Sequence, residues 1–537
     1  MVAAYLDAIA PVRPMRDGEI QTSEGGIAHA ADNWTRLRRF LILGTEGGNF
    51  YTPQQDLTIE NVGVVTACLN EDAPRTIAEI ITISLEGRAP KNEPAILALA
   101  MASVHKDIMS RTLAFRALRD VCRTGTHILH FAAYREALGG GWGRGMRSAV
   151  GTWFTAQTPR DLAYQAVKYP SRDGWALADL LRLSHPKMDD ERSFVAKYIV
   201  DGWTEWKGTE GEAATFLNAV RSCGETDVPA QVAWIIKNFR VPREAVPTQY
   251  LNSATVWDAL LADMPMTAMI RNLGKMTNVG LLVAGSDAER TVADRLLDGE
   301  RLRKARVHPI SILNALRVYE QGHGERGSLT WTPSKRVVNA LDEAFYLAFK
   351  TVAPTGKRIR IALDVSGSMD GSKIAGMALS AREASAAMAM VTLATEPEAH
   401  VVAYSDRLVG VNLRPSMRLD EVIRTLRSIP MGGTYCSLPI MQATEAGASI
   451  DLFASWTDSE TWNGGGMWGH NRAPSMTASE ALRAYRLRSG IEARHVVCAM
   501  SANNVSIADP RDPGQLDVCG LDAATPQIIS DFALGLV

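Results

Sequence analysis

Several features that would place this 537-residue chain in a common class are missing from its sequence. The six cysteines are scattered and form no CxxC pair, which argues against a zinc ribbon and against a secreted disulfide-linked fold. No apolar run is long enough to cross a bilayer. The N-terminal MVAAYLDAIAPVRP also lacks the basic region and the long apolar run of a signal peptide. These absences favour a cytoplasmic protein that contacts no membrane.

Familiar catalytic signatures are missing as well. The sequence contains no HExxH zinc motif, no GxxxxGK[ST] phosphate loop and no G-x-S-x-G nucleophile elbow. We therefore expect no catalytic residues and no enzyme activity. The formal net charge of -2 excludes no partner, because a basic surface can be balanced by an acidic one elsewhere in the chain.

Two patterns of apolar residues meet near residues 351–357. Before this point apolar residues recur at helical spacing, and after it short β-rich runs alternate with helical stretches. The expected helices of the first part follow the N-cap candidates Asp32 and Asn33 and then lie at 91–104, 109–120, 143–157, 175–184, 189–202, 257–272 and 334–350. We predict a multidomain protein. Residues 1–353 would form an all-α, HEAT-like stack of helical hairpins, and residues 354–537 an α/β domain.

Alternation in the second part predicts a parallel sheet covered by helices on both faces. The expected strands are 359–363, 399–404, 450–456 and 495–500, and the helices between them are 374–393, 421–428 and 478–488. Ligands of such folds gather beyond the carboxyl ends of the strands.

A candidate cation site lies at the end of the first expected strand. Asp364, Ser366 and Ser368 place one carboxylate and two hydroxyls at alternate positions of a loop that opens a helix. Thr434 lies in a Gly-Gly-Thr loop, and Asp458 closes the expected strand 450–456, so both are predicted nearby. Mg²⁺ prefers such oxygen ligands, with waters completing the shell. A helix-capping turn explains the first three residues but not all five.

A local excess of positive charge marks residues 101–150. Arg116, Arg119 and Arg123 can share one helical face, and Arg144 follows them. The aromatic residues interleaved with these cations are Phe131, Tyr134 and Trp142. This mixture suits single-stranded RNA, whose phosphates need neutralising and whose bases stack. A solvated surface is the simpler alternative.

A second polar group surrounds an apolar stretch. Lys168, Arg172, His185 and Lys187 are expected at helix ends and in loops, whereas Trp175 is expected in the core. Several cations close together are typical of a phosphate-binding surface.

Five ordered segments resemble the Ro autoantigen family of the 60 kDa type, which joins a helical TROVE module to a von Willebrand A-type domain. These segments are DNWTRLRRFLILGTEGG (32–48), GWALADLLRLSHPK (174–187), MPMTAMIRNLGKMT (264–277), PTGKRIRIALDVSGSM (354–369) and ADPRDPGQLDVCGLD (508–522). The five predicted cation ligands also resemble the metal-ion-dependent adhesion site of von Willebrand A domains. Plentiful alanine and glycine with scarce lysine favours a bacterial representative.

The resemblance implies a ring of helical hairpins with a positively charged central hole. In the family, single-stranded ends of misfolded noncoding RNAs enter the hole, while Y RNA binds the outer surface. Outer-surface residues of the family match Lys168, Arg172 and His185 here. The basic residues at 101–150 have no such correspondence. The implied function is a noncatalytic scaffold in RNA quality control, able to present RNA to an exoribonuclease.

Two other functions fit parts of the sequence. A metal-dependent protein-adhesion module on a helical scaffold would dock a partner's carboxylate at the cation site, with RNA incidental. A metal-dependent hydrolase using Asp364 and Asp458 is less well supported, because a single metal with hydroxyl ligands has no evident general base beside it.

Overall fold

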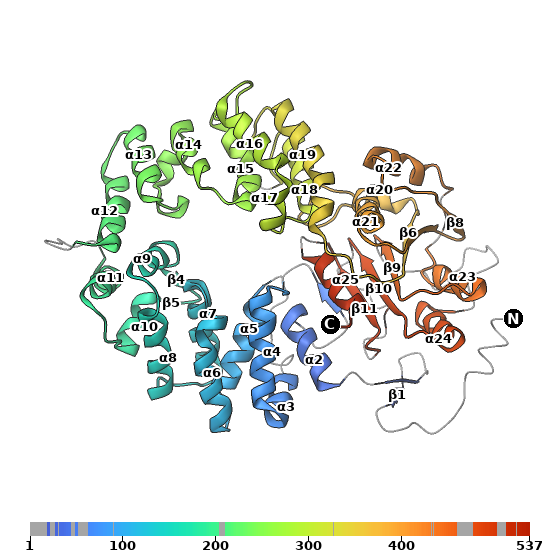
Figure 1. Ribbon diagram of the computed structural model, residues 1–537, viewed down its shortest axis with the longest axis horizontal. Coiled ribbons are helices and arrows are strands. Elements are labelled where there is room, and N and C mark those ends of the chain that lie inside the picture. The colour runs from blue at the N-terminus through green and yellow to red at the C-terminus, as the bar shows by residue number, and fades with distance from the viewer. Residues whose placement is uncertain are drawn as a thin grey trace. The chain divides into compact units, whose positions relative to one another are not determined.

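The computed structural model describes residues 19–21, 27–29, 32–44, 49–51, 63–89, 91–202, 210–325, 327–430, 432, 434–458, 476–501, 508, 512–521 and 524–537. The chain divides into two compact units. The sheet unit comprises Met1–Leu57, Ala293–Ser328 and Val337–Val537, and the helical unit comprises Thr58–Val292 and Leu329–Arg336. Helices dominate the N-terminal part and an α/β arrangement the C-terminal part (Figure 1), which confirms the predicted fold class. No described helix combines the length and apolar character needed to span a membrane.

Consecutive short helices build the region from residue 63 to residue 297. The helices are α3 (Gly63–Glu71), α4 (Ala73–Glu86), α5 (Glu93–Val104), α6 (Ile108–Val121), α7 (Gly125–Ala137), α8 (Arg144–Thr155), α9 (Pro159–Lys168), α10 (Leu177–Ser184), α11 (Asp190–Asp201), α12 (Glu212–Glu225), α13 (Pro229–Phe239), η2 (Arg243–Ala245), η3 (Thr248–Asn252), α14 (Ala254–Ala262), α15 (Met266–Asn278) and α16 (Asp287–Leu297). Most of them pack on helices one or two positions away in the chain, such as α4 on α6 and α5 on α7. This is the packing expected of stacked helical hairpins.

Two expected helices of this region differ from the structure. The stretch 257–272 contains α14 and α15 rather than one helix, because Pro265 cannot continue a helix and instead caps the start of α15. The stretch 175–184 begins as a strand: β4 (Ser171–Arg172) pairs with β5 (Trp175–Ala176), and α10 starts only at Leu177. This small hairpin carries one of the predicted RNA-binding residues.

The remaining elements belong mostly to the sheet unit. They are β1 (Glu19–Gln21), β2 (Ile27–His29), α2 (Asn33–Leu43), β3 (Asn49–Tyr51), α17 (Gly299–Lys304), α18 (Pro309–Glu320), α19 (Lys335–Leu347), η4 (Ala348–Thr351), β6 (Ile359–Asp364), α20 (Ser368–Gly371), α21 (Ala381–Thr395), β7 (Ala399–Tyr404), β8 (Leu408–Gly410), α22 (Leu419–Arg427), α23 (Leu438–Ala446), β9 (Leu452–Thr457), α24 (Ala478–Ser489), β10 (Arg494–Ala499), β11 (Gln515–Cys519) and α25 (Thr525–Ala533). The predicted cap of α2 is confirmed, since Asp32 accepts a hydrogen bond of 2.7 Å from the backbone N–H of Thr35.

Seven strands form the main sheet in the order β3-β11-β10-β9-β6-β7-β8. The four expected strands are present as β6, β7, β9 and β10. The expectation of a parallel sheet holds for every neighbouring pair except β7 and β8, which are antiparallel. Strand β3 comes from the N-terminal part of the chain and pairs with β11 at the sheet edge. In the parallel part, the carboxyl ends of β6 and β9 lie side by side.

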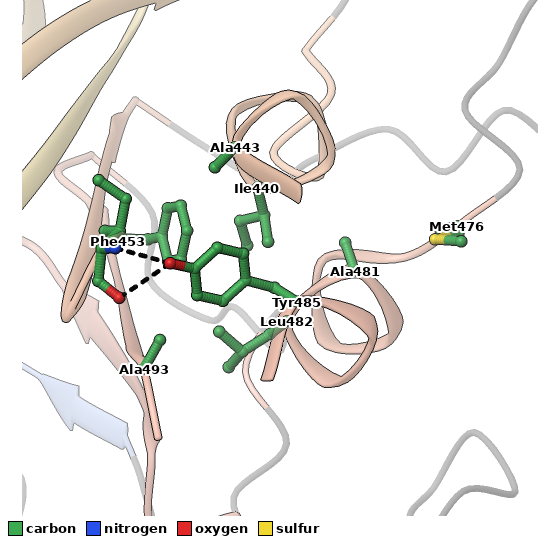
Figure 2. Close-up of a cluster of buried hydrophobic side chains, with 9 residues drawn as sticks. Ile440, Ala443, Phe453, Met476, Ala481, Leu482, Tyr485 and Ala493 are labelled. Atoms are coloured by element: carbon green, nitrogen blue, oxygen red, sulfur yellow. Dashed lines mark hydrogen bonds between the residues drawn. The ribbon is translucent and has the colours of Figure 1, made fainter. Parts of the chain in front are cut away.

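A buried cluster fixes α23 and α24 against β9 (Figure 2). The Tyr485 ring on α24 packs edge-on against Phe453 of β9, with ring centroids 5.1 Å apart. Its hydroxyl accepts a hydrogen bond of 2.6 Å from the backbone N–H of Ile450. It also donates one of 2.7 Å to the Ala448 carbonyl. Burial of aromatic and aliphatic surface dominates the stability of such a cluster. It holds the strand from which Asp458 emerges.

Candidate RNA interface and cation site

Two buried carboxylates lie together at the carboxyl end of the sheet. Asp364 ends β6 and is 1% exposed, whereas Asp458 follows β9 and is 2% exposed. Burial raises the pKa of Asp364, and the nearby charge of Asp458 adds to this, although hydrogen bonds to Asp364 oppose it. The two carboxylates thus bring negative charge into a buried site, where a bound cation would neutralise it.

Hydroxyl groups surround the Asp364 carboxylate. Thr434 donates a hydrogen bond of 3.3 Å to its Oδ2 atom, and the Oγ atoms of Ser366 and Ser368 are 3.1 Å apart. The backbone N–H of Ser366 donates to Asp364 Oδ1 at 2.7 Å. Two carboxylates and three hydroxyls offer only oxygen, the donor that Mg²⁺ prefers, so the residues fit a hard cation. Among the described residues, no three His, Cys, Asp or Glu side chains cluster as metal ligands.

Two further residues that sequence reasoning missed shape this site. Thr457, the last residue of β9, donates a hydrogen bond of 2.7 Å to Asp364 Oδ2. The Arg382 guanidinium on α21 is 1% exposed; it donates to the Ser366 carbonyl at 2.9 Å and lies 2.9 Å from Asp370 Oδ2. Asp370 also pairs with Arg427 at 2.9 Å. These contacts hold the loop from Asp364 to Ser368 in place.

In the helical unit, Arg172 lies on the β4–β5 hairpin, next to α7 (Figure 1). Asp173 and Gly174 form its two-residue turn with φ angles of 51° and 79°, the conformation that an Asp-Gly pair favours. The Asp173 carboxylate binds Nδ1 of the buried His130. The turn therefore presents the exposed Arg172 side chain from an anchored support. The Asp-Gly pair is the sequence signal that could have predicted this hairpin.

Lys168 ends helix α9 among aromatic rings. Its Nζ atom donates a hydrogen bond of 3.2 Å to the Tyr164 hydroxyl and lies 5.3 Å from the Tyr164 ring and 5.4 Å from the Tyr169 ring. Burial alone would lower the pKa of Lys168, but the hydrogen bond to Tyr164 and the nearby tyrosines raise it. The side chain therefore stays cationic while its position is restricted.

A polar groove of about 490 Å³ brings Arg144 and His185 together between α8 and the end of α10. His185 ends α10 in a left-handed conformation with φ of 46°, which directs the chain into Pro186 and Lys187. The further cationic and hydroxyl residues that line the groove are Arg147, Lys187, Ser148, Thr152, Thr155 and Ser184. Cations and hydroxyls without a carboxylate are suited to phosphate oxygens.

The other predicted arginines are not part of this groove. Arg116 and Arg119 are exposed on α6. Arg123 donates hydrogen bonds of 2.9 Å and 3.0 Å to the hydroxyl and carbonyl oxygens of Ser84, so it connects the end of α6 to the end of α4. Arg123 is nevertheless exposed, and its contact with RNA stays a prediction.

Two aromatic predictions were wrong. Phe131 is fully buried on the inner side of α7 and offers no ring to a ligand. Trp175 is only partly buried rather than a core residue, and its ring lies 5.8 Å from that of Trp142. A strand begins at Trp175, so the helical spacing on which its core placement relied does not apply there.

Comparison with known proteins gives consistent matches along the chain. Family models described as "TROVE domain" and "Ro60 vWA domain" match residues 20–317 and 358–533. The chain is 37% identical over 523 residues to a Deinococcus radiodurans protein named "RNA-binding protein RO60", covering 97% of this chain and 96% of that protein. It is 35% identical over 603 residues to the protein of the same name from Caenorhabditis elegans, covering 97% and 91%. The crystal structure of the Deinococcus radiodurans RO (RSR) protein matches with a TM-score of 0.87 at 37% identity, covering 94% of this chain and 100% of that chain.

Proposed function

The chain belongs to the Ro60 family of RNA-binding proteins, and from this premise we propose that it is a noncatalytic scaffold for noncoding RNA. Lys168, Arg172 and His185 would hold Y RNA, and single-stranded ends of misfolded RNAs would form a second class of ligand. The observation that supports this most is the groove joining Arg144 and His185, because its cations and hydroxyls match a phosphate backbone.

A binding titration of the purified chain against a labelled small structured RNA tests this function. Neutralising several phosphates makes affinity fall steeply with salt. Arg172→Ala is expected to weaken binding and to reduce the salt slope by about 1. Arg221→Ala removes an exposed arginine of α12 that is paired with Glu225 in the same unit, and it serves as the matched control. Absent or salt-insensitive RNA binding by the unaltered chain contradicts the proposal.

For the sheet unit, we propose a Mg²⁺ site on Asp364, Ser366, Ser368, Thr434 and Asp458. The cation would neutralise the paired carboxylates, and a carboxylate of a protein ligand would complete its shell. This second function, metal-dependent adhesion, is supported by the burial of both carboxylates. Asp364→Ala and Arg172→Ala separate the two functions. RNA binding that survives Arg172→Ala but fails with Asp364→Ala would favour adhesion as the main role.

A tethered exoribonuclease is the remaining part of the proposal, with bound RNA as the bridge. Sequencing of the RNA that copurifies from the native cell should find one dominant small noncoding RNA. Any associated nuclease should dissociate after ribonuclease treatment. A background of ribosomal fragments alone would count against a role in RNA quality control.

A further inference from the structure

We infer that Trp142 and Trp175 form a stacking site for an unpaired RNA base beside Arg172; this inference rests on the proposed RNA-binding function. Trp142 lies between α7 and α8, and Trp175 opens β5, so two separate segments supply the rings. Their centroids are 5.8 Å apart with the planes inclined by 38°, and both side chains are partly exposed. Paired tryptophans left partly open to solvent offer the flat apolar surface on which bases stack.

Arg172 is placed to hold the phosphate of the same RNA strand. It lies directly opposite Trp175 in the β4–β5 pairing, where facing Cβ atoms are about 5 Å apart. A second cation, Arg147 on α8, donates a hydrogen bond of 2.9 Å from Nε to the Trp142 carbonyl. Cations next to aromatic rings are the arrangement of single-stranded RNA sites.

The acidic groups nearby have partners within the protein. Glu136 accepts a hydrogen bond of 3.0 Å from Nε1 of Trp175, and Asp173 is bound to His130. Both carboxylates thereby support the site. The cations beside the rings favour a polyanion, and the two tryptophan rings favour RNA over an acidic peptide because bases can stack on them.

Glycines and a tight turn shape the backbone around both rings. Gly139 adopts a φ of 75°, and a Cβ atom at Gly140 would lie 1.9 Å from Nη1 of the buried Arg135. The loop that carries Trp142 therefore requires glycine at these positions. On the other side, the Asp173–Gly174 turn fixes Trp175. A tryptophan side chain has only two χ angles, so it loses little conformational entropy when a base stacks on it.

Oligonucleotides with and without bases distinguish stacking from phosphate binding. The full chain is titrated with a single-stranded RNA of about ten nucleotides and with an abasic strand of equal length. Trp142→Ala should weaken binding of the base-containing strand about tenfold, within the range for one base–aromatic contact, and leave the abasic strand unchanged. Trp142→Phe should recover most of the affinity, which also guards against a folding defect. Arg172→Ala should weaken both strands.

Trp234→Ala provides the matched control, because Trp234 is 61% exposed on α13 of the same unit. We expect it to change neither affinity. Equal binding of the two strands by the unaltered chain would overturn the stacking site while leaving RNA binding intact. A loss with Trp234→Ala as large as with Trp142→Ala would also overturn it. Failure of the unaltered chain to bind either strand while it binds the structured RNA would overturn the stacking site alone, whereas failure with all three RNAs would reject the RNA-binding function as well.

Discussion

The sheet unit and the helical unit build their candidate sites in opposite ways. The cation site is buried and assembled from residues far apart in the chain, such as Asp364 and Thr457, whose side chains meet because parallel strands end at one edge. The RNA surface is exposed and depends on local backbone features. These are the two-residue turn that follows Arg172 and the left-handed conformation of His185 at a helix end. A buried site gains from every hydrogen bond around it, whereas an exposed one depends on how rigidly its side chains are presented.

Removal of the buried Arg382 side chain should show this contrast most strongly. Arg382→Ala removes the shorter of two hydrogen bonds to the Ser366 carbonyl, which keeps the one from the Met369 N–H at 3.3 Å. It also removes one partner of Asp370, so we expect a loss of about 3 kcal/mol in unfolding free energy. Arg407→Ala removes an exposed pair with Asp406 and should cost less than about 1 kcal/mol. Urea denaturation followed by circular dichroism measures both. Equal losses of unfolding free energy in the two variants would show that burial does not strengthen the contribution of Arg382 to stability.

Mg²⁺ binding should stabilise the sheet unit alone. A ligand present at about one hundred times its Kd stabilises the folded state by about 2.7 kcal/mol. Calorimetry of the full chain should therefore show one transition that rises with Mg²⁺ and falls with EDTA. Asp364→Asn keeps the size of the side chain but removes its charge, and it should abolish the shift. A shift that survives Asp364→Asn would place the cation elsewhere.

Only part of the difference between the cation site and the RNA surface could be predicted from the sequence. The closeness of Asp364 and Asp458 could be predicted because strand ends converge by topology, even though the two residues lie far apart in the chain; cation binding there stays a prediction. Thr457 and Arg382 could not be predicted, because no spacing links a strand residue or a helix residue to the carboxylate or carbonyl that it contacts.

On the helical side, charge alone did not predict that Arg123 connects α6 to α4 through Ser84, or that Arg172 lies on a hairpin. The interleaving of aromatic residues with cations gave Phe131 the wrong exposure, and helical spacing did so for Trp175. Periodicity tells which residues share a face, but it does not tell which face a later hairpin covers or where a helix gives way to a strand.

Acid should weaken the sheet unit through a buried histidine. His495 on β10 is fully buried against Ser455, and burial lowers its pKa to about 3. Since the unfolded chain binds a proton near pH 6.5, stability is complete above that pH and is lost as pH falls toward the folded value. Between pH 6.5 and pH 5 the loss should reach about 2 kcal/mol. Urea denaturation across this range should show that stability falls less with pH in His495→Gln than in the unaltered chain. His400→Gln, at an exposed position, should show the same fall in stability as the unaltered chain.

The smallest effect tests how the helical unit presents its cations. Gly174→Ala forces a side chain into a backbone with φ of 79°, which costs about 1 kcal/mol and loosens the turn between Arg172 and Trp175. RNA affinity should fall a few-fold while the Mg²⁺ response of the sheet unit stays unchanged. Gly141→Ala is the matched control, because a Cβ atom there meets nothing within 4 Å. If Gly174→Ala and Gly141→Ala have the same RNA affinity, Arg172 does not need a rigid turn. The exposed surface would then bind RNA by charge alone.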